Sequence, residues 1–342
     1  MDLVDWRELS PEAVAPLYAD QASAWSSALG WDLSVSWAAI ERARAAGALP
    51  GLVCRTSADA IAAWTFFLRQ GDVLQIGALV GAGATPVRML LEAILDSPEA
   101  AGARELTCLL YPARPNAMSA LSRRRFQLEA QRYLSRDLND AGAVVAPDVL
   151  PAELVARRWL DDDAVACVRL LERAYAGEHS GRALAPNGTL EEWAAYLGQV
   201  LKTPACGILQ PHASVVIEER STLLPVGFIL VTRVGPRTAH IAQIAVDPRW
   251  RGRGAGRTLV GKAAKAAAAA GLDRLTLLVA DENDRAARLH SAEGFAEVGQ
   301  LVFAHRRMPV RRQHTVRSAA TARVISDVDR LVSTSCDASQ RP

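Results

Sequence analysis

The sequence contains few cysteines, and none of them lies at a spacing that would bind zinc. Five cysteines are scattered through 342 residues, and no two of them form a CxxC pair. Disulfide frameworks and structural zinc sites need cysteines at short, regular spacings. We therefore expect reduced thiols, no metal site and a cytoplasmic protein.

A strong charge of one sign and a long hydrophobic run are also absent. The formal net charge is only +2, which gives no broad attraction to nucleic acid or to an anionic membrane. The longest nearly apolar stretch, residues 60–68, is far too short to cross a bilayer. The first residues lack the basic start and apolar core of a secretory signal. We expect neither a nucleic-acid nor a membrane partner, and any anion must bind at a local site.

Half of the residues are hydrophobic, and at about 150 residues for each domain the length suits two domains. Helical and strand patterns alternate along the chain, which predicts a mixed α/β (α+β) fold. Residues 141–150 are mostly small and include a proline, so they predict a linker between residues 1–140 and 151–308. Residues 309–342 lack aromatics and predict a flexible tail, with a short helix near 324–332.

Hydrophobic periodicity and capping residues predict the elements of each half. In the first half we expect a helix starting at Ser10-Pro11, a helix over 86–95, and strands over 52–54, 60–68, 73–80 and 106–111. In the second half we expect helices over 164–175, 189–201, 256–270 and 284–292, and strands over 154–159, 214–218, 226–231, 238–246, 275–279 and 297–306.

The two halves contain an internal repeat. Residues 106–126 align without gaps on residues 275–295, with six of the 21 positions identical. Each segment is a predicted strand followed by a helix, and the elements before them come in the same order. This pattern favours a duplicated domain over a chance similarity.

A glycine-rich loop at residues 251–256, Arg-Gly-Arg-Gly-Ala-Gly, follows a strand and opens a helix. A helix N-terminus has unpaired N–H groups and a partial positive charge, so it attracts phosphate. Glycines let the backbone approach the phosphates closely, and Arg251 and Arg253 add charge and bidentate donors. The loop therefore predicts a phosphorylated ligand.

Two common phosphate motifs do not fit this loop. A Walker loop would need Gly-Lys-Ser/Thr, which is missing. A Rossmann fingerprint would follow the first strand of its unit and use a GxGxxG frame, whereas this loop follows several strands and reads R-x-x-G-x-G.

The pattern V-x-P-x-x-R-G-x-G-x-G, followed by L-x-V-x-x-x-N-x-x-A-x-x-L-x-x-x-x-G-F, resembles the GNAT superfamily of N-acyltransferases. Its residues here are Val246, Pro248, 251–256, Leu277, Val279, Asn283, Ala286, Leu289, Gly294 and Phe295. The resemblance implies two tandem GNAT-like domains, each with a mostly antiparallel central sheet flanked by helices, in a layout similar to that of mycothiol synthase. The catalytic domain would be 151–308, and 1–140 would be a degenerate copy.

The resemblance also implies an acetyl-CoA or other acyl-CoA donor lying between the strands that contain Val246 and Leu277. The loop would bind the pyrophosphate, the main chain near Ile244 would bind the pantetheine arm, and one amide would polarise the thioester carbonyl. Asn283 would contact the pantetheine or simply cap the next helix. The residues implied in donor binding are Ile244, Ala245, Val246, Arg251, Gly252, Arg253, Gly254, Ala255, Gly256 and Asn283.

The general acid departs from the family pattern. A tyrosine usually follows the leucine of the last helix, but this chain has His290 there. Histidine has an unperturbed pKa of about 6.5 and could protonate the leaving thiolate at neutral pH. The alternative is a partly buried helix histidine without a catalytic task.

Several residues are candidates for the general base. His240 begins the strand before the loop, and Gln243 in its middle could orient a water. The other candidates are Glu178, His179, Glu218 and Glu219, although each is more easily explained as a solvated surface group. Holding both reactants in line would itself supply much of the rate.

The first half has no equivalent loop, since the connection at residues 80–86 lacks the arginines. We expect it to support the fold or to build the acceptor pocket. Its tryptophans Trp25, Trp31, Trp37 and Trp64 suit a core better than an aromatic acceptor pocket. Three functions remain: acyl transfer from acyl-CoA to the amine of a small molecule, acyl transfer from a carrier protein's phosphopantetheine arm, or CoA binding without catalysis.

Overall fold

The structure is a computed structural model that describes residues 1–140, 150–178, 181, 184–202 and 206–308. The predicted linker, apart from Leu150, lies outside the described residues. So do His179, the predicted tail and its short helix.

The first half contains the strands and helices expected from its hydrophobic pattern, together with further elements that the pattern did not predict. Its strands are β1 (Asp2–Asp5), β2 (Gly51–Arg55), β3 (Ile61–Gln70), β4 (Val73–Gly81), β5 (Glu105–Leu110) and β6 (Gln127–Asp137). Its helices are η1 (Trp6–Glu8), α1 (Pro11–Leu29), α2 (Ser34–Ala45), α3 (Ala84–Leu95), α4 (Pro98–Ala101) and α5 (Pro115–Arg123). Ser10 caps α1, as predicted, because its side chain accepts a bond from the amide of Ala13.

The second half repeats this order. Its strands are β7 (Leu154–Arg158), β8 (Ile208–Leu209), β9 (Val215–Glu219), β10 (Pro225–Gly235), β11 (Thr238–Val246), β12 (Arg274–Ala280) and β13 (Ala296–Arg307). Its helices are α6 (Asp163–Tyr175), α7 (Leu190–Lys202), η4 (Pro248–Trp250), α8 (Ala255–Ala269) and α9 (Asp284–Ala292).

The pairing of the strands confirms that the two halves have the same topology. In each half four neighbouring strands pair antiparallel, β1 to β4 and β7, β9, β10 and β11. The next pair in each half, β4–β5 and β11–β12, is parallel, and α3 or α8 makes the crossover between its strands. The overlay of 106–126 on 275–295 therefore joins equivalent elements, β5–α5 and β12–α9.

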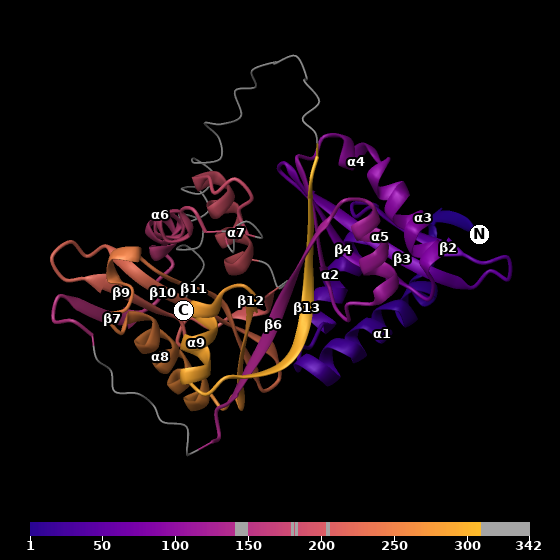
Figure 1. Cartoon of the computed structure of the whole chain (residues 1–342). Coiled ribbons are helices and arrows are strands. Elements are labelled where there is room, and N and C mark those ends of the chain that lie inside the picture. Colours follow the sequence, from indigo (N-terminus) through magenta and orange to yellow (C-terminus); the bar gives the residue numbers. More distant parts are fainter. Residues whose placement is uncertain (141–149, 179–180, 182–183, 203–205, 309–342) are drawn as a thin grey trace, which may run out of the picture. The chain divides into compact units, whose positions relative to one another are not determined.

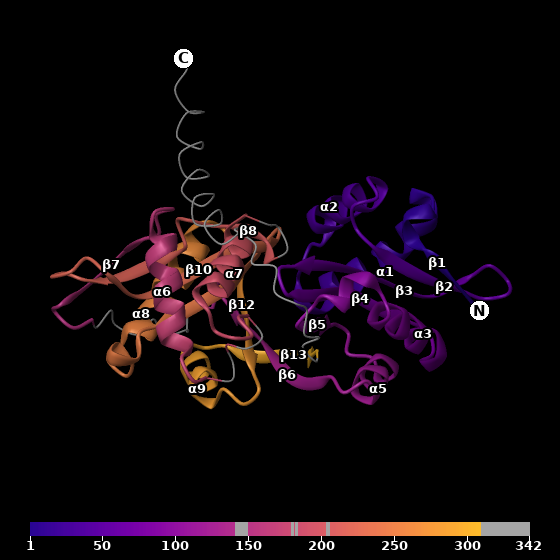
Figure 2. The same cartoon turned by 90° about the horizontal axis from the view of Figure 1, so that it is seen from above.

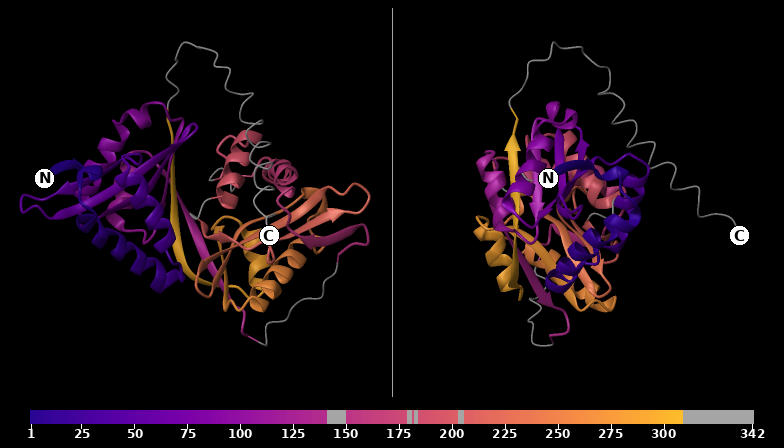
Figure 3. Two further views of the ribbon diagram at one scale, coloured as in Figure 1. Left: turned by 180° about the vertical axis from the view of Figure 1, so that it is seen from behind. Right: turned by 90° about the vertical axis from the view of Figure 1, so that its right-hand side faces the viewer.

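The halves exchange their last strands. β13 lies between β5 and β6, and β6 lies between β13 and β12, all antiparallel. These two long strands lie between the two halves in Figure 1 and in the left panel of Figure 3, and Figure 2 shows them from above. The result is one 13-stranded sheet in which each half completes the sheet of the other. The segment of β13 was predicted as a strand, whereas β6 and the exchange were not predicted.

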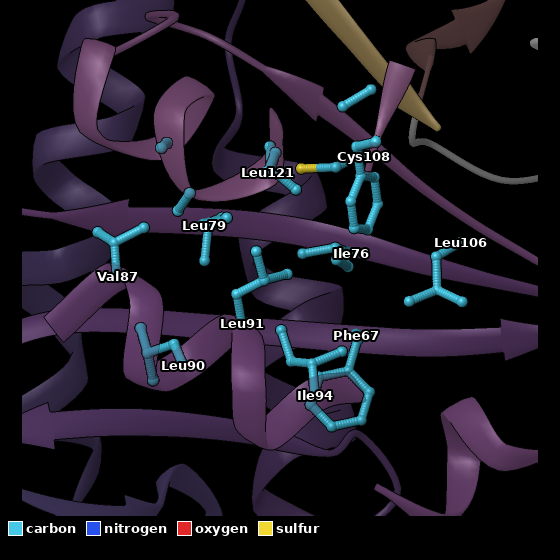
Figure 4. Close-up of a cluster of buried hydrophobic side chains, with 14 of the residues drawn as sticks. Phe67, Ile76, Leu79, Val87, Leu90, Leu91, Ile94, Leu106, Cys108 and Leu121 are labelled. Carbon is cyan, nitrogen blue, oxygen red and sulfur yellow. The ribbon is translucent and has the colours of Figure 1, made fainter. Parts of the chain in front are cut away.

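Helices cover both faces of the sheet in each half. In the first half α3 and α5 bury Leu90, Leu91 and Leu121 against Phe67 and Ile76 (Figure 4). The opposite face packs against η1, α1 and α2 through an aromatic core that includes Trp6, Trp37 and Trp64. In the second half α8 covers one face, and α6 and α7 cover the other (Figure 1). No helix among the described residues is long and apolar enough to cross a membrane.

Candidate functional site

A cleft opens where β11 and β12 part. The two strands pair from Thr238 to Ile241 and from Arg274 to Leu277, and no further ladder pair joins them within the described chain. In the pairing of β10 with β11, Leu230 lies opposite Gln243 and Val231 lies opposite Ile241. Ala242 is therefore the extra residue of a bulge in β11. Bulges bend and twist a strand, and here the bulge lies where the separation begins. An open strand edge can take an extended chain as an additional strand.

The glycine-rich loop closes one end of this cleft. Gly252 and Gly254 have positive φ values of 74° and 87°, which other residues adopt only at a cost. Gly254 directly precedes α8, and no side chain caps the first turn of that helix. Its first N–H groups are therefore free to bind an anion. A Cβ on Gly256 would lie 3.2 Å from Leu289 Cδ2, so α8 and α9 approach closely here.

The side chain of Arg251 is already bonded within the protein. Its Nε donates to Val246 O at 3.1 Å, one terminal nitrogen donates to Glu178 at 2.7 Å, and the other donates to Ala174 O. Arg285 also donates to Glu178, at 3.3 Å. Phosphate binding by the Arg251 side chain would require it to release at least one of these bonds. Its present contacts attach the end of α6 to the loop.

The other two arginines at the start of α8 are more exposed. The guanidinium of Arg253 lies 5.2 Å from the ring centre of Trp250, a cation–π distance. Arg257 pairs with the buried Glu293 at 3.1 Å, although half of the Arg257 side chain remains exposed. Arg253 is exposed and can turn toward a phosphate at the helix start, whereas Arg257 would have to share its pairing with the buried Glu293.

Asn283 is the N-cap of α9. Its Oδ1 accepts a bond from the amide of Ala286 at 3.1 Å. Capping of the helix is one of the two roles that the sequence left open for Asn283, and the structure shows this role. Asn283 also lines the cavity described below, so capping leaves part of the residue available to a ligand.

Gln243 is held by two tyrosines that the sequence analysis did not select. Tyr196 on α7 donates to Gln243 Oε1 at 2.9 Å and to Ala242 O at 3.1 Å. The Gln243 Nε2 donates to Tyr175 Oη at 3.0 Å. The amide side chain is therefore fixed, and burial raises the pKa of both tyrosines. These contacts join residues more than 45 positions apart, so no local pattern indicates them.

His240 is buried and neutral. Thr276 donates its hydroxyl proton to Ala239 O at 3.0 Å, so it accepts the 3.0 Å bond from His240 Nδ1–H. This assigns the tautomer whose Nε2 has a free lone pair. Burial lowers the pKa of His240 to about 3, which makes it a weak base.

His290 is also buried, with 2% of its surface exposed. Its Nδ1 has no hydrogen-bond partner among the described residues, and burial lowers its pKa to about 4. The imidazole is therefore neutral at pH 7. Its burial agrees with the alternative of a buried helix histidine, and the role as acid stays a prediction. A role as acid now needs a bound ligand that raises this pKa.

The acidic candidates for the base have structural partners. Glu218 pairs with Arg157 at 2.7 Å, and Glu219 accepts a bond from Thr222 at 2.9 Å. Neither of them lines the cavity. Glu178 does line it, but it joins Arg251 and Arg285. His179 lies outside the described residues.

The cleft belongs to a cavity of about 1870 Å³ that both halves line. Ile244, Ala245 and Val246 line it on one side, together with Gln243 and His290. It extends past His240 to the strands of the first half. The volume exceeds that of a usual small-molecule pocket, about 300–1,000 Å³, so it has room for two ligands.

In the first half β4 and β5 also separate partway along their length, but no equivalent of the glycine-rich loop follows. Pairing of β4 with β5 ends at Ile76 and Cys108. Asn116 donates to Gly81 O at 2.8 Å, and α3 begins at Ala84, directly after Gly83. This hydrogen bond therefore joins the end of β4 to the start of α5, at the position where the second half has its glycine-rich loop. Among the described residues, no group of three or more His, Cys, Asp or Glu could hold a metal ion.

Comparisons with known proteins agree with this geometry. Residues 168–295 match the Acetyltransferase (GNAT) family model. No curated protein matches the chain. A GCN5-related N-acetyltransferase from Sphaerobacter thermophilus has 17% identity and a TM-score of 0.64, covering 92% of this chain and 98% of its own.

Two further structures show the same fold. A tandem GNAT protein from the clavulanic acid biosynthesis pathway has 16% identity and a TM-score of 0.53, covering 77% of this chain and 84% of its own. A glucosamine N-acetyltransferase region of a fungal multi-domain GH3 β-N-acetylglucosaminidase has 14% identity and a TM-score of 0.61, covering 89% and 38%. At such identities the likeness concerns the fold alone.

Proposed function

We propose that this chain transfers an acyl group from acyl-CoA to the amine of a small molecule, because residues 168–295 match the Acetyltransferase (GNAT) family model. The observation that carries the proposal is the open edge of β11, which ends at the uncapped first turn of α8. Pantetheine is an extended amide chain, which an open strand edge can accept, and in CoA it is linked to a pyrophosphate, which a helix start can bind.

In this proposal the donor lies along β11. The N–H groups of residues 251–256 bind the pyrophosphate, with charge from Arg253 and Arg257. The main chain at residues 244–246 binds the pantetheine arm, and Asn283 contacts it from the start of α9. The thioester then lies near Gln243, beside the bulge at Ala242, where a main-chain amide can polarise its carbonyl.

The reaction is a direct transfer between two bound substrates. The amine nitrogen forms a bond to the thioester carbon, the C–S bond breaks, and the proton lost by nitrogen ends on the CoA sulfur. His240 Nε2 or a water oriented by Gln243 accepts that proton first. His290 is the proposed donor to sulfur, once the negative charge that develops on the leaving sulfur raises its pKa. Alignment of the substrates in the cavity supplies much of the rate.

A thermal-shift titration with acetyl-CoA tests the donor site. A ligand that binds only the folded protein raises its melting temperature. Gly254→Asn adds a side chain in the loop, and asparagine tolerates positive φ. We expect this variant to lose the shift. A wild-type chain that acetyl-CoA leaves unshifted would contradict the proposal.

The other end of α8 supplies a matched control. Gly271 also has positive φ, 77°, and a Cβ there meets nothing within 4 Å. Gly271→Asn should therefore keep the full acetyl-CoA shift. Pantetheine in place of CoA addresses the carrier-protein alternative, since a donor bound without its adenosine diphosphate would shift wild type and Gly254→Asn equally.

A further inference from the structure

Beyond the paired end of the cleft, the cavity has an aromatic wall that comes from the first half and its exchanged strand. This wall consists of Trp25, Trp31, Tyr111 and Tyr133, all of which line the cavity. The Trp25 ring meets Trp31 edge-on at 5.2 Å and Tyr111 at 5.4 Å. Trp31 Nε1 donates to Tyr133 Oη at 2.7 Å. The rings support one another, so the wall is a fixed surface.

The aromatic wall adjoins the place where the acyl group would be transferred. Tyr133 on β6 pairs in register with Leu278 on β12. Its ring stacks on His240 at 6.2 Å, and the Trp31 ring lies 5.0 Å from His240. His240 comes two residues before the bulge at Ala242, where β11 leaves β12. Trp31 and Tyr133 are themselves buried, so a molecule that presents an amine to a thioester here would meet the wall at the partly buried rings of Trp25 and Tyr111.

Three of the four acidic residues that line the described cavity are bonded to residues outside the aromatic wall. Asp72 pairs with Arg104 at 3.0 Å, Glu178 pairs with Arg251, and Glu192 bonds to Asn187. The fourth acidic residue that lines the cavity, Glu191, is exposed in the first turn of α7. No described carboxylate is bonded to a residue of the aromatic wall.

This environment disfavours a cationic acceptor. An alkylamine is protonated at neutral pH, and burying an ammonium group without a carboxylate costs several kcal/mol. A cation–π contact returns only about 0.5–2 kcal/mol, so desolvation dominates. His240 beside the wall is itself buried, and this burial lowers its pKa. An arylamine is uncharged at neutral pH, and its ring can pack on tryptophan and tyrosine.

We propose that the acceptor is an arylamine, bound with its ring against the aromatic wall and its uncharged nitrogen beside His240. This inference rests on the proposed acyl transfer and names its substrate class. The aniline nitrogen bonds to the thioester carbon, the C–S bond breaks, and one N–H proton passes through His240 Nε2 or water to the sulfur. The products are an anilide and free CoA, with no net gain or loss of protons.

The direct test compares two amines of the same ring size. The full chain is incubated with acetyl-CoA and either aniline or cyclohexylamine at neutral pH, and thiol release is followed. We expect kcat/KM to be at least about tenfold higher for aniline, a modest part of the desolvation cost. Equal or better use of cyclohexylamine overturns the inference.

The acetyl-CoA thermal shift, recorded in parallel, separates this inference from the proposed function. If acetyl-CoA causes no shift, the acyl transfer itself is wrong. If the shift is present and aniline is not acetylated, only the arylamine assignment falls.

Adding the missing carboxylate gives a second test. Gln131 lines the cavity on β6, two residues before Tyr133 and on the same side of the strand. Gln131→Glu should lower the preference for aniline over cyclohexylamine by about tenfold, because the new carboxylate can pair with an ammonium. Gln300→Glu, at an exposed position of β13, is the control and should keep the wild-type preference. The same preference in both variants overturns the inference.

Discussion

At the scale of single residues, three buried histidines differ in how burial and neighbours act on them. Desolvation lowers the pKa of His240 and His290. His305 lies between two carboxylates, 3.2 Å from Glu105 and 3.0 Å from Glu129, and its pKa is raised, chiefly by the bond to Glu105. A lowered pKa and a raised one give opposite dependences of stability on pH.

His290 should make the protein less stable in acid. Its pKa is about 4 in the folded state, against 6.5 for an unperturbed histidine, so the unfolded chain binds the extra proton as pH falls from about 6.5 to about 4. This costs up to about 3 kcal/mol. In His290→Gln the free energy of unfolding, measured with urea across that range, should fall less steeply than in wild type. A parallel decline in both proteins would contradict the assignment.

His305 should act in the other direction. Because its folded pKa is raised, its contribution is fully present below the unfolded pKa and is lost as pH rises through the folded pKa. His305→Gln should therefore lose more stability at about pH 5.5 than at about pH 8.5, as urea unfolding would show. His212→Gln, at an exposed position, controls for the loss of a histidine. An equal loss at both pH values would show that the ion pairs do not matter.

Residues of this site could be predicted where a short sequence motif indicates them. The glycines of residues 251–256 and the Asn283 cap follow from short spacings, and the structure gives them loop and helix-start geometry. Tyr175 and Tyr196 were missed because they reach Gln243 only through tertiary packing. The burial of His290 was missed for the same reason, since its helix position alone does not determine its pKa.

At the scale of elements, α8 was predicted almost to its ends. Glycine stands before its first residue and after its last turn, and glycine at such positions is a strong signal. β6 was missed, although its length exceeds that of most strands. Six of its eleven residues are charged or amide side chains, so it lacks the apolar alternation that identified the other strands.

Two glycines within α8 should respond differently to alanine. A Cβ at Gly261 meets nothing within 4 Å, so Gly261→Ala should raise the free energy of unfolding by about 0.5–1 kcal/mol through helix propensity. At Gly256 the Cβ would lie 3.2 Å from Leu289, and Gly256→Ala should gain less or lose stability. Urea unfolding without ligand measures both. Equal gains would mean that α9 yields to the added methyl group without cost.

At the scale of the whole molecule, the strand exchange makes each half depend on the other. The sequence predicted a duplication, and the equal strand order of the two halves agrees with that prediction. The exchange could not be predicted, because β6 and β13 are equivalent in the repeat and either pairing satisfies the same local patterns. The exchange also places Tyr133 and Gln131 of the first half beside β12 of the second. We propose that 1–140 is retained as a degenerate domain for this reason.

This dependence can be measured by separating the halves. Residues 150–308 alone would leave the edge of β12 without β6 and β13 without β5, and unpaired strand edges promote aggregation. We expect this fragment to be insoluble or to show no acetyl-CoA shift when expressed alone. Co-expressed with residues 1–140, it should co-purify as a one-to-one complex that regains the shift, since both exchanged strands are then present. A second half that binds acetyl-CoA with full affinity as an isolated monomer would show that β6 is dispensable, and the first half would then need another explanation.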